Sequence, residues 1–131
     1  MEQTLIVIKP DGVERKLVGT IISRFENREF TIHKMKMFQF TKEEAEEFYL
    51  PHREKRFFSS LVKFIISGNV VAVILEGSTS IEVVRQMIGS TKSDEAAPGT
   101  IRGDLGLGLK DNVIHASDSK ESFERESKII F

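Results

Sequence analysis

Thr4-Leu5-Ile6-Val7-Ile8 is the stretch of the sequence that decides the fold. It is a near-continuous apolar run of mostly β-branched residues, which is the pattern of a buried central strand. A second apolar run, Val70-Val71-Ala72-Val73-Ile74-Leu75, predicts another buried strand. A sheet built on two such strands needs helices to cover it, and the remaining segments are expected to supply those helices.

The segments around the two runs show helical or strand periodicity. Residues 19–30 place Ile21, Ile22 and Phe25 at helical spacing, with charged residues on the other face. Residues 31–40 alternate between apolar and polar side chains, which predicts a half-buried strand. Further helices are predicted over 41–49 with a capping box at Thr41, over 57–67, over 79–89 capped by Thr79 with Glu82, and over 119–129. Residues 113–115 predict a short strand, and the glycine-containing, aperiodic residues 90–111 before it predict a long loop.

The predicted order of elements is therefore β-α-β-(α-α)-β-α-loop-β-α. Without the inserted helix pair it becomes βαββαβ, the split-βαβ unit of ferredoxin-like folds. We predict an α+β fold of this kind: a four-stranded antiparallel sheet with helices on its surface, an inserted helix pair and a long loop before the last strand. No linker or internal repeat divides the chain, so residues 1–131 are expected to form one domain.

The composition is that of an ordinary globular protein, with 131 residues, 40% hydrophobic and 30% charged side chains, and a net charge of −1. This balance gives no reason to expect nucleic acid or an anionic membrane as a partner. The chain has no cysteine, which excludes disulfides, thiolate catalysis and Cys-based zinc sites. The first apolar run is too short for a signal peptide or a membrane span, so a cytoplasmic location is expected.

Three histidines are candidates for chemistry. His115 lies in Asn112-Val113-Ile114-His115-Ala116-Ser117-Asp118-Ser119, where small and polar residues follow it and offer space and hydrogen-bond partners. A satisfied core histidine is the plain alternative for it. His33 lies in an alternating strand and is expected to have a surface or structural role. His52 begins the basic segment His52-Arg53-Glu54-Lys55-Arg56, which fits a solvated turn and an anion-binding patch equally well.

Positive side chains strengthen the case for a phosphate site. Lys9 stands at the C-terminal end of the first strand, where sheets of α/β type commonly bind ligands, although it also fits an ordinary strand-end lysine. Arg102 lies between glycines in the predicted loop, and Arg85 lies on the helix 79–89, where an ordinary polar helix face is the alternative. Polyphosphate recognition needs such charges together with hydrogen-bonding groups, for which the candidates are Tyr49, Thr91 and His52. An imidazole beside cationic clamps is what phosphoryl transfer through a histidine requires.

Several motifs are absent from the sequence. It contains no G-x-x-x-x-G-K-S/T phosphate loop, no H-R-D or D-F-G segment of protein kinases and no G-x-G-x-x-G. No group of histidine and acidic residues has the spacing of a dedicated metal site. A magnesium ion is therefore expected only as an ion that is already bound to the phosphates of a substrate.

The sequence resembles the nucleoside diphosphate kinase family over essentially all of its 131 residues. The segments that carry the resemblance occur in order and at ungapped spacing. They are Lys9-Pro10-Asp11-Gly12, Phe57-Phe58, Ser67-Gly68, Glu76-Gly77, Pro98-Gly99-Thr100-Ile101-Arg102-Gly103-Asp104 and the eight residues from Asn112 to Ser119.

The resemblance implies an activity and a role for each matching position. His115 takes the γ-phosphoryl group of a nucleoside triphosphate and passes it to any nucleoside diphosphate, by a covalent ping-pong mechanism that maintains the triphosphate and deoxytriphosphate pools. The implied phosphate ligands are Lys9, Tyr49, Arg85, Thr91 and Arg102, with His52 and Lys55 on the side of the α-phosphate. Asn112 and Lys9 are implied to reach the sugar hydroxyls, Phe57 and Leu109 the two faces of the base, and Ser117 and Glu126 to support His115.

The sequence also departs from the family pattern. Lys55-Arg56 replaces the common arginine and proline, Lys92-Ser93 replaces asparagine and proline, and Asn69 stands where proline is usual. The chain ends at Phe131 without the extension that joins subunit contacts in many relatives. A homo-oligomer is expected, and the choice between a hexamer, a tetramer built from dimers and a dimer stays open.

Two alternative functions, and one alternative role for Phe57, also fit parts of the sequence. A catalytically weak nucleotide sensor would use the same residues, although a decayed relative would most often lose His115. A ferredoxin-like RNA-binding domain would need exposed aromatic residues on its central strands, and neither central run contains one. Phe57 also fits a core position beside Phe58, and one of this pair is expected to be buried and the other exposed.

Overall fold

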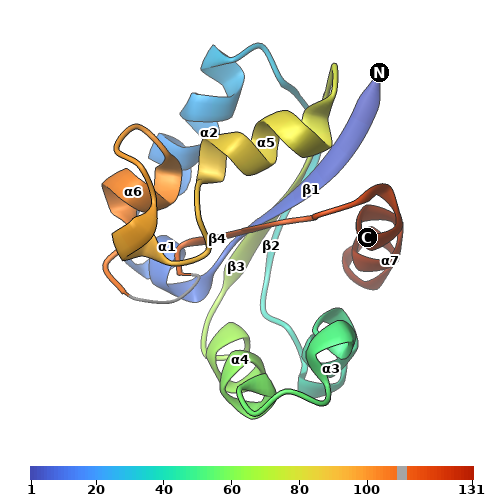
Figure 1. Ribbon diagram of the computed structural model, residues 1–131. Helices are drawn as coiled ribbons and strands as arrows, with labels where there is room; N and C mark the ends of the chain where they lie inside the picture. The colour runs from blue at the N-terminus through green and yellow to red at the C-terminus, as the bar shows by residue number, and fades with distance from the viewer. Residues whose placement is uncertain (109–111) are drawn as a thin grey trace.

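The computed structural model describes residues 1–108 and 112–131 and contains the predicted elements in the predicted order, together with short helices at Pro10–Glu14 and Ile101–Leu105 that were not predicted (Figure 1). The strands are β1 (Glu2–Ile8), β2 (Thr31–Phe38), β3 (Val70–Gly77) and β4 (Ile114–Ala116). The helices are α1 (Pro10–Glu14), α2 (Val18–Asn27), α3 (Lys42–Phe48), α4 (Phe58–Ile65), α5 (Ser80–Ile88), α6 (Ile101–Leu105) and α7 (Lys120–Ile130), with short 3-10 helices at Leu50–His52 and Ser93–Glu95.

The four strands form one antiparallel sheet in the order β2-β3-β1-β4. The first strand lies inside the sheet, and its Val7 is opposite Ala72 of β3 on one side and His115 of β4 on the other. This order and the βαββαβ connections are those of a ferredoxin-like α+β fold, so the predicted fold class is confirmed.

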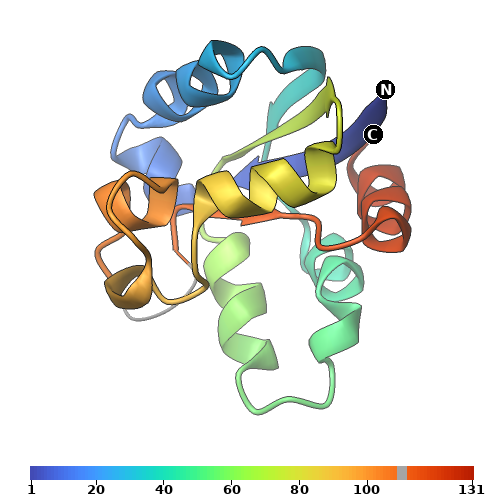
Figure 2. The ribbon, with the colours of Figure 1, turned by 45° about the horizontal axis from the view of Figure 1, so that its top comes forward.

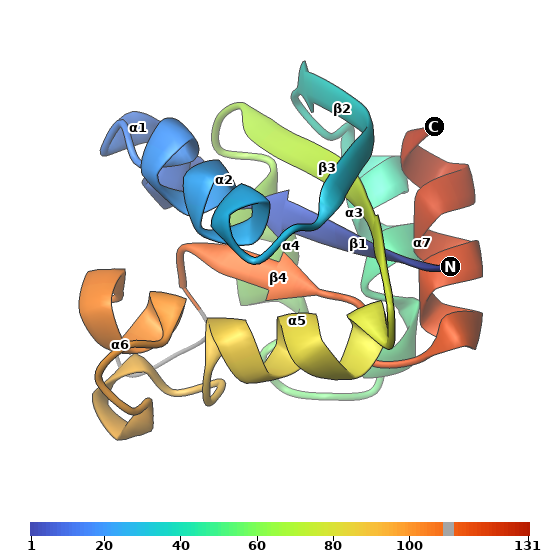
Figure 3. The same ribbon diagram turned by 90° about the horizontal axis from the view of Figure 1, so that it is seen from above.

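The apolar side chains of β1 alternate between two cores, one on each face of the sheet. Ile6 and Ile8 pack with residues of α2 and α5, whereas Leu5 and Val7 pack with residues of α3, α4 and α7. Figure 3 shows α2 and α5 in front of the strands and α4 behind them. Because both faces are covered, this strand needs apolar side chains at almost every position, which is the pattern of the run from Thr4 to Ile8.

The inserted helix pair projects from one side of the sheet, with α3 and α4 next to each other (Figure 2). The predicted capping box at the start of α3 is confirmed. The Thr41 hydroxyl accepts from the Glu44 N–H at 3.1 Å, and the Glu44 carboxylate accepts from the Thr41 N–H at 2.9 Å. The cap fixes the residue at which α3 begins.

The predictions for β2 and for the start of α5 were wrong. The strand β2 is not half-buried but mostly exposed, because it lies at the sheet edge, and Met35 and Met37 are 55% and 57% exposed. Its pairing with β3 is interrupted at His33, which is exposed. Thr79 precedes α5 but makes no side-chain cap. The carboxylate of Glu2 accepts from the Ile81 N–H at 2.9 Å instead, a contact that the local sequence does not encode.

The region predicted as a long loop contains the short 3-10 helix Ser93–Glu95 and the helix α6. The hydroxyl of Thr100 starts α6 by accepting from the Gly103 N–H at 3.0 Å. An ion pair of 2.8 Å between Arg24 and Asp104 joins α6 to α2. A five-residue helix is too short to show a periodic pattern, so this helix could not be predicted from periodicity. Within the described residues, no helix is long and apolar enough to cross a membrane.

Candidate active site

His115 lies in the middle of β4, and its side chain is 17% exposed. Directly opposed residues of an antiparallel pair share a face, so His115 lies on the same face as Val7, towards α3 and α7. The ring of Phe48, at the end of α3, contacts the imidazole edge-to-face with 4.9 Å between ring centroids. The imidazole is therefore held by packing on one side and is open to solvent only in part.

A buried carboxylate holds one nitrogen of this imidazole. Glu126 Oε1 lies 2.9 Å from His115 Nε2 and accepts a second hydrogen bond, of 2.7 Å, from the hydroxyl of Ser117. Ser117 is fully buried and Glu126 is 4% exposed. Since Nε2 is engaged by a carboxylate, the tautomer with its proton on Nε2 is favoured, and Nδ1 carries the lone pair. The three side chains thus form a preorganised group that presents one nucleophilic nitrogen.

Charge and burial oppose each other at Glu126. Burial raises the pKa of this carboxyl, but the charge and hydrogen bond of His115, the bond from Ser117 and the charge of Arg125 outweigh it, so the pKa lies below its ordinary value. The carboxylate is therefore ionised at neutral pH and stabilises positive charge on the imidazole.

This shift predicts a pH dependence of stability. A carboxyl whose pKa is lowered by folding contributes stability above its ordinary pKa of 4.5, and that contribution is lost as the pH falls through the lower folded value. The free energy of unfolding of the wild type, minus that of Glu126→Gln, should therefore shrink as the pH falls below 4.5. Urea unfolding between about pH 3 and 5 measures this difference, and a difference that grows on acidification within this range would contradict the assignment.

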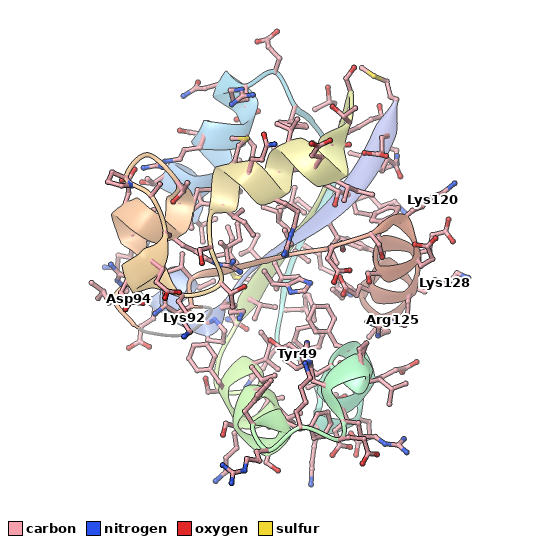
Figure 4. The ribbon with its side chains drawn as sticks, viewed as in Figure 1. Tyr49, Lys92, Asp94, Lys120, Arg125 and Lys128 are labelled. Carbon is pink, nitrogen blue, oxygen red and sulfur yellow. The ribbon has the colours of Figure 1, made fainter. Side chains whose placement is uncertain are left out.

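Arg125, the neighbour of Glu126 on α7, connects the carboxylate to α3. Its Nη1 donates to the carbonyl of Glu47 at 2.8 Å and its Nη2 to the carbonyl of Phe48 at 3.2 Å, and Nη2 lies 3.5 Å from Glu126 Oε2. Figure 4 shows Arg125 on the side of α7 that faces α3, and Tyr49 at the end of α3. The guanidinium thereby fixes the end of α3 relative to the imidazole. Sequence reasoning missed Arg125 and Phe48, because their partners lie far away along the chain.

Two arginines bind the backbone on either side of His115. Arg102 Nη2 donates to the carbonyl of Ile114 at 2.8 Å, and Arg85 Nη1 donates to the carbonyl of Ala116 at 3.1 Å. Arg102 lies on α6, not on a loop as predicted, and is only 2% exposed, with a further bond of 3.1 Å to the carbonyl of Gly89. Positive charge is therefore concentrated where the imidazole is placed, which favours an anionic ligand there.

The backbone that leads into β4 is strained at Val113. This buried β-branched residue has φ 77°, a left-handed conformation that such residues rarely adopt. The N–H of Val113 donates to the carboxylate of Asp11 at 3.0 Å, and the carbonyl of Val113 accepts from the N–H of Lys9 at 2.8 Å. Lys9 itself lies directly after β1, at the strand end as predicted, and it is fully buried. These two hydrogen bonds connect the end of β1 to the start of β4, beside Asn112 and His115. Backbone strain of this kind is often found at functional sites.

A row of ring contacts leads from the imidazole to the inserted helices. Beyond Phe48, the rings of Tyr49, His52 and Phe57 follow one another, with centroid distances of 5.1, 6.2 and 5.7 Å. Lys55 Nζ lies 5.5 Å from the centre of the Phe57 ring. Phe57 and Phe58 are both half-buried, so the prediction of one buried and one exposed ring was wrong.

The remaining predicted residues are Asn112, Thr91 and Leu109. Asn112, directly before the strained residue, is half-buried and bonded to Ser93 at 2.8 Å. Thr91 is exposed beyond the end of α5. Leu109 lies outside the described residues. In the part of the chain that the structure describes, no three histidine or acidic residues gather in a group able to hold a metal ion.

Close packing around Ser93 makes Gly106 a sensitive position. A Cβ added at Gly106 would lie 2.1 Å from Ser93 Oγ and 2.6 Å from the carbonyl oxygen of Arg102, so the backbone would have to move. Gly106→Ala is expected to lower the free energy of unfolding by about 1–3 kcal/mol. Gly19→Ala is the matched control, because a Cβ there meets nothing within 4 Å, and it should leave stability unchanged or raise it by about 0.5 kcal/mol. Urea unfolding measures the stability of both variants, and equal stabilities would contradict the close packing at Gly106.

Taken together, the sheet, the carboxylate-held imidazole and the flanking guanidinium groups define a ferredoxin-like α+β protein with a histidine-centred, cationic candidate site. The sequence model of the nucleoside diphosphate kinase family matches residues 2–131. The chain belongs to this family and is therefore a phosphotransferase, as the resemblance of its segments predicted.

Individual comparisons agree with this assignment. The chain is 59% identical to the nucleoside diphosphate kinase of Hyperthermus butylicus over 131 residues, which is 100% of this chain and 92% of that relative. The nucleoside diphosphate kinase of Aquifex aeolicus superposes with a TM-score of 0.96 at 50% identity, covering 99% of this chain and 94% of that one. The enzyme of Halobacterium salinarum in complex with CDP gives a TM-score of 0.95 at 43% identity, covering 99% of this chain and 87% of that one.

Proposed function

We propose that the chain transfers the γ-phosphoryl group of a nucleoside triphosphate to a nucleoside diphosphate by a ping-pong mechanism through a phosphohistidine on His115. The observation that carries this proposal is the engagement of Nε2 by Glu126, which directs the lone pair to Nδ1. Maintenance of the nucleoside and deoxynucleoside triphosphate pools would be the cellular result.

The reaction has two chemically similar halves. In the first, the Nδ1 lone pair forms a bond to the γ-phosphorus while the bond from that phosphorus to the β,γ-bridging oxygen breaks, and the nucleoside diphosphate leaves. In the second, a terminal β-phosphate oxygen of another diphosphate attacks the same phosphorus, and the P–N bond breaks. The proton on Nε2 stays in its hydrogen bond to Glu126, whose charge stabilises the positively charged ring of the phosphorylated intermediate.

The cationic groups would stabilise the charge of the transferred group. A guanidinium has five N–H donors, and the bond from Arg85 to the carbonyl of Ala116 uses one of them. The proposed phosphate ligands are Lys9, Tyr49, Arg85, Thr91 and Arg102, with His52 and Lys55 near the α-phosphate. We further propose that Asn112 and Lys9 bind the sugar hydroxyls, that Phe57 and Leu109 enclose the base, and that Ser117 orients Glu126 by the bond described above.

We propose that magnesium enters as part of the substrate, on the nucleotide phosphates. The carboxylate of Glu126 beside His115 is bonded to His115 and Ser117, and the described residues contain no group of three histidine or acidic side chains that could hold the ion. We also propose that residues 1–131 form one domain, that the chain works in the cytoplasm, and that it forms a homo-oligomer, either a hexamer or a tetramer built from dimers. Sedimentation equilibrium would distinguish these assemblies from each other and from a dimer.

Base selectivity is expected to be low. Stacking on an aromatic ring tolerates every base, because each base offers a π-face, and Phe57 is partly exposed for such a contact. GTP, CTP and dTTP should therefore donate phosphate to GDP or ADP at rates within about a hundredfold of each other, a range of roughly 2.7 kcal/mol. Competition assays with paired donors measure the ratios, and a larger spread would show that the base edge is read.

A label-and-chase experiment tests the mechanism directly. The purified protein is mixed with γ-³²P-ATP and magnesium without an acceptor, and unlabelled GDP is then added. Label on the protein that is acid-labile and base-stable, and that moves to GDP at the rate of turnover, is the expected result. Nucleotide binding without any protein label would leave a nucleotide sensor as the function and would contradict the enzymatic proposal.

A further inference from the structure

Ser93 makes a long-range hydrogen bond to one of the residues proposed to bind nucleotide. It begins the short 3-10 helix Ser93–Glu95, is 6% exposed, and its hydroxyl donates to Asn112 Oδ1 at 2.8 Å. Figure 4 labels Lys92 and Asp94, its two neighbours in the chain. The bond ties the segment that follows α5 to the residue that leads into β4.

This bond selects one orientation of the Asn112 amide. An asparagine side chain has an acceptor oxygen at one end and two N–H donors at the other, and a half-turn about its last bond exchanges them. The Ser93 hydroxyl donates to the oxygen, so the NH₂ group is turned away from Ser93. The main chain on the C-terminal side of Asn112 is already fixed by Asp11 and Lys9, which bind Val113. The bond from the Ser93 hydroxyl then selects the orientation of the amide.

The hydroxyl of Ser93 is itself held in place by close packing. The space that a Cβ of residue 106 would fill is occupied by Ser93 Oγ, at 2.1 Å from that Cβ. The family resemblance implies a proline at position 93, and a proline has no hydroxyl and cannot make this bond. The bond to Asn112 is therefore tied to a residue in which this chain departs from the family pattern.

We propose that Ser93 is a positioning residue for the nucleotide sugar. Its hydroxyl holds the Asn112 amide with the NH₂ group directed to the sugar hydroxyls, whose oxygens accept hydrogen bonds. This inference rests on the proposed function in one respect, the contact between Asn112 and the sugar. It places part of the discrimination between hydroxylated and dideoxy sugars on a residue that does not touch the nucleotide.

The test compares nucleotides that differ only in their sugar hydroxyls. Calorimetry gives the dissociation constants of GDP and 2′,3′-dideoxy-GDP for the wild type, Ser93→Ala, Ser93→Pro and Asn112→Ala. In Ser93→Ala, the ratio of the dideoxy-GDP constant to the GDP constant should fall about fivefold, the value of one ordinary hydrogen bond. Ser93→Pro should behave in the same way, because Lys92 has an extended backbone and a proline is tolerated at the first position of a helix.

Two further measurements separate positioning from general damage. Adding Ser93→Ala to Asn112→Ala should cause no further change in the ratio, because the hydroxyl acts through the amide. Equal weakening of GDP and dideoxy-GDP binding would indicate a structural role and overturn the proposal, and so would an unchanged ratio in both Ser93 variants. Because the test measures binding and not phosphoryl transfer, its result decides this inference whatever the outcome of the label-and-chase experiment.

Discussion

Replacing His115 with alanine is expected to lower phosphoryl transfer between nucleotides at least about ten-thousandfold, because it removes the atom that carries the phosphoryl group. Neither Glu126 nor Ser117 offers a replacement nucleophile, since the carboxylate and the hydroxyl are bonded to each other and buried. A coupled spectrophotometric assay measures the loss, and the label-and-chase experiment should show no protein label in the same variant.

Two control variants sharpen this prediction. His33→Ala removes another histidine, one that is exposed on the edge strand β2, and should leave the rate unchanged. Glu126→Gln keeps the nucleophile but removes the charge that stabilises the imidazole, and about a hundredfold lower rate is expected. The protein label should persist in Glu126→Gln and form more slowly. Residual transfer above one per cent in His115→Ala, or loss of the label in His33→Ala, would contradict the assignment of the nucleophile.

Replacing Arg102 with methionine is expected to lower the free energy of unfolding by about 3–5 kcal/mol. The guanidinium is almost fully buried and donates to the carbonyls of Gly89 and Ile114. Its loss leaves both carbonyls without this partner, that of Ile114 at a buried residue and that of Gly89 at a half-buried one, and a methionine can fill the space but cannot donate. Domains of this size are typically stable by only about 5–15 kcal/mol, so a large share of the stability depends on this side chain.

Urea unfolding of matched variants tests this expectation. Arg28→Met makes the same chemical change at an exposed position at the end of α2 and should change stability by less than about 0.5 kcal/mol. Arg102→Lys keeps the positive charge but loses the planar fork that reaches two carbonyls, so it should fall between the wild type and the methionine variant. A loss of under about 1 kcal/mol in Arg102→Met would mean that water or a neighbouring group replaces the two bonds.

The parts of the fold that could be predicted are those where one sequence pattern has one structural solution. The run from Thr4 to Ile8 is apolar throughout because both faces of β1 are covered, and this signal is local. The capping box at Thr41 is local as well. In contrast, the cap of α5 comes from the carboxylate of Glu2, and the exposure of β2 follows from its place at the sheet edge. Both depend on which strands become neighbours, which no short window of sequence contains.

The candidate site shows the same division. The local sequence marked His115 as a candidate, and the resemblance supplied Glu126, whose contact with the imidazole the structure shows. The role of Arg125 was not predictable, because it depends on carbonyl groups at the end of α3 that carry no residue-specific signal. The bond between Ser93 and Asn112 was hidden for a similar reason, since the sequence marked position 93 only as a departure from the family.

The central position of β1 has a consequence for how this molecule forms. Its Val7 pairs with Ala72 and with His115, so the first strand to be synthesised finds its two neighbours only after long stretches of intervening chain. Pairings of such high sequence separation are slow to form, because the entropy of closing the loops is lost before the contacts stabilise them. The histidine itself lies on the strand that pairs last along the chain, beside β1. Folding and the acquisition of nucleotide affinity are therefore expected to occur in one cooperative event, and a partly folded chain would have no working site.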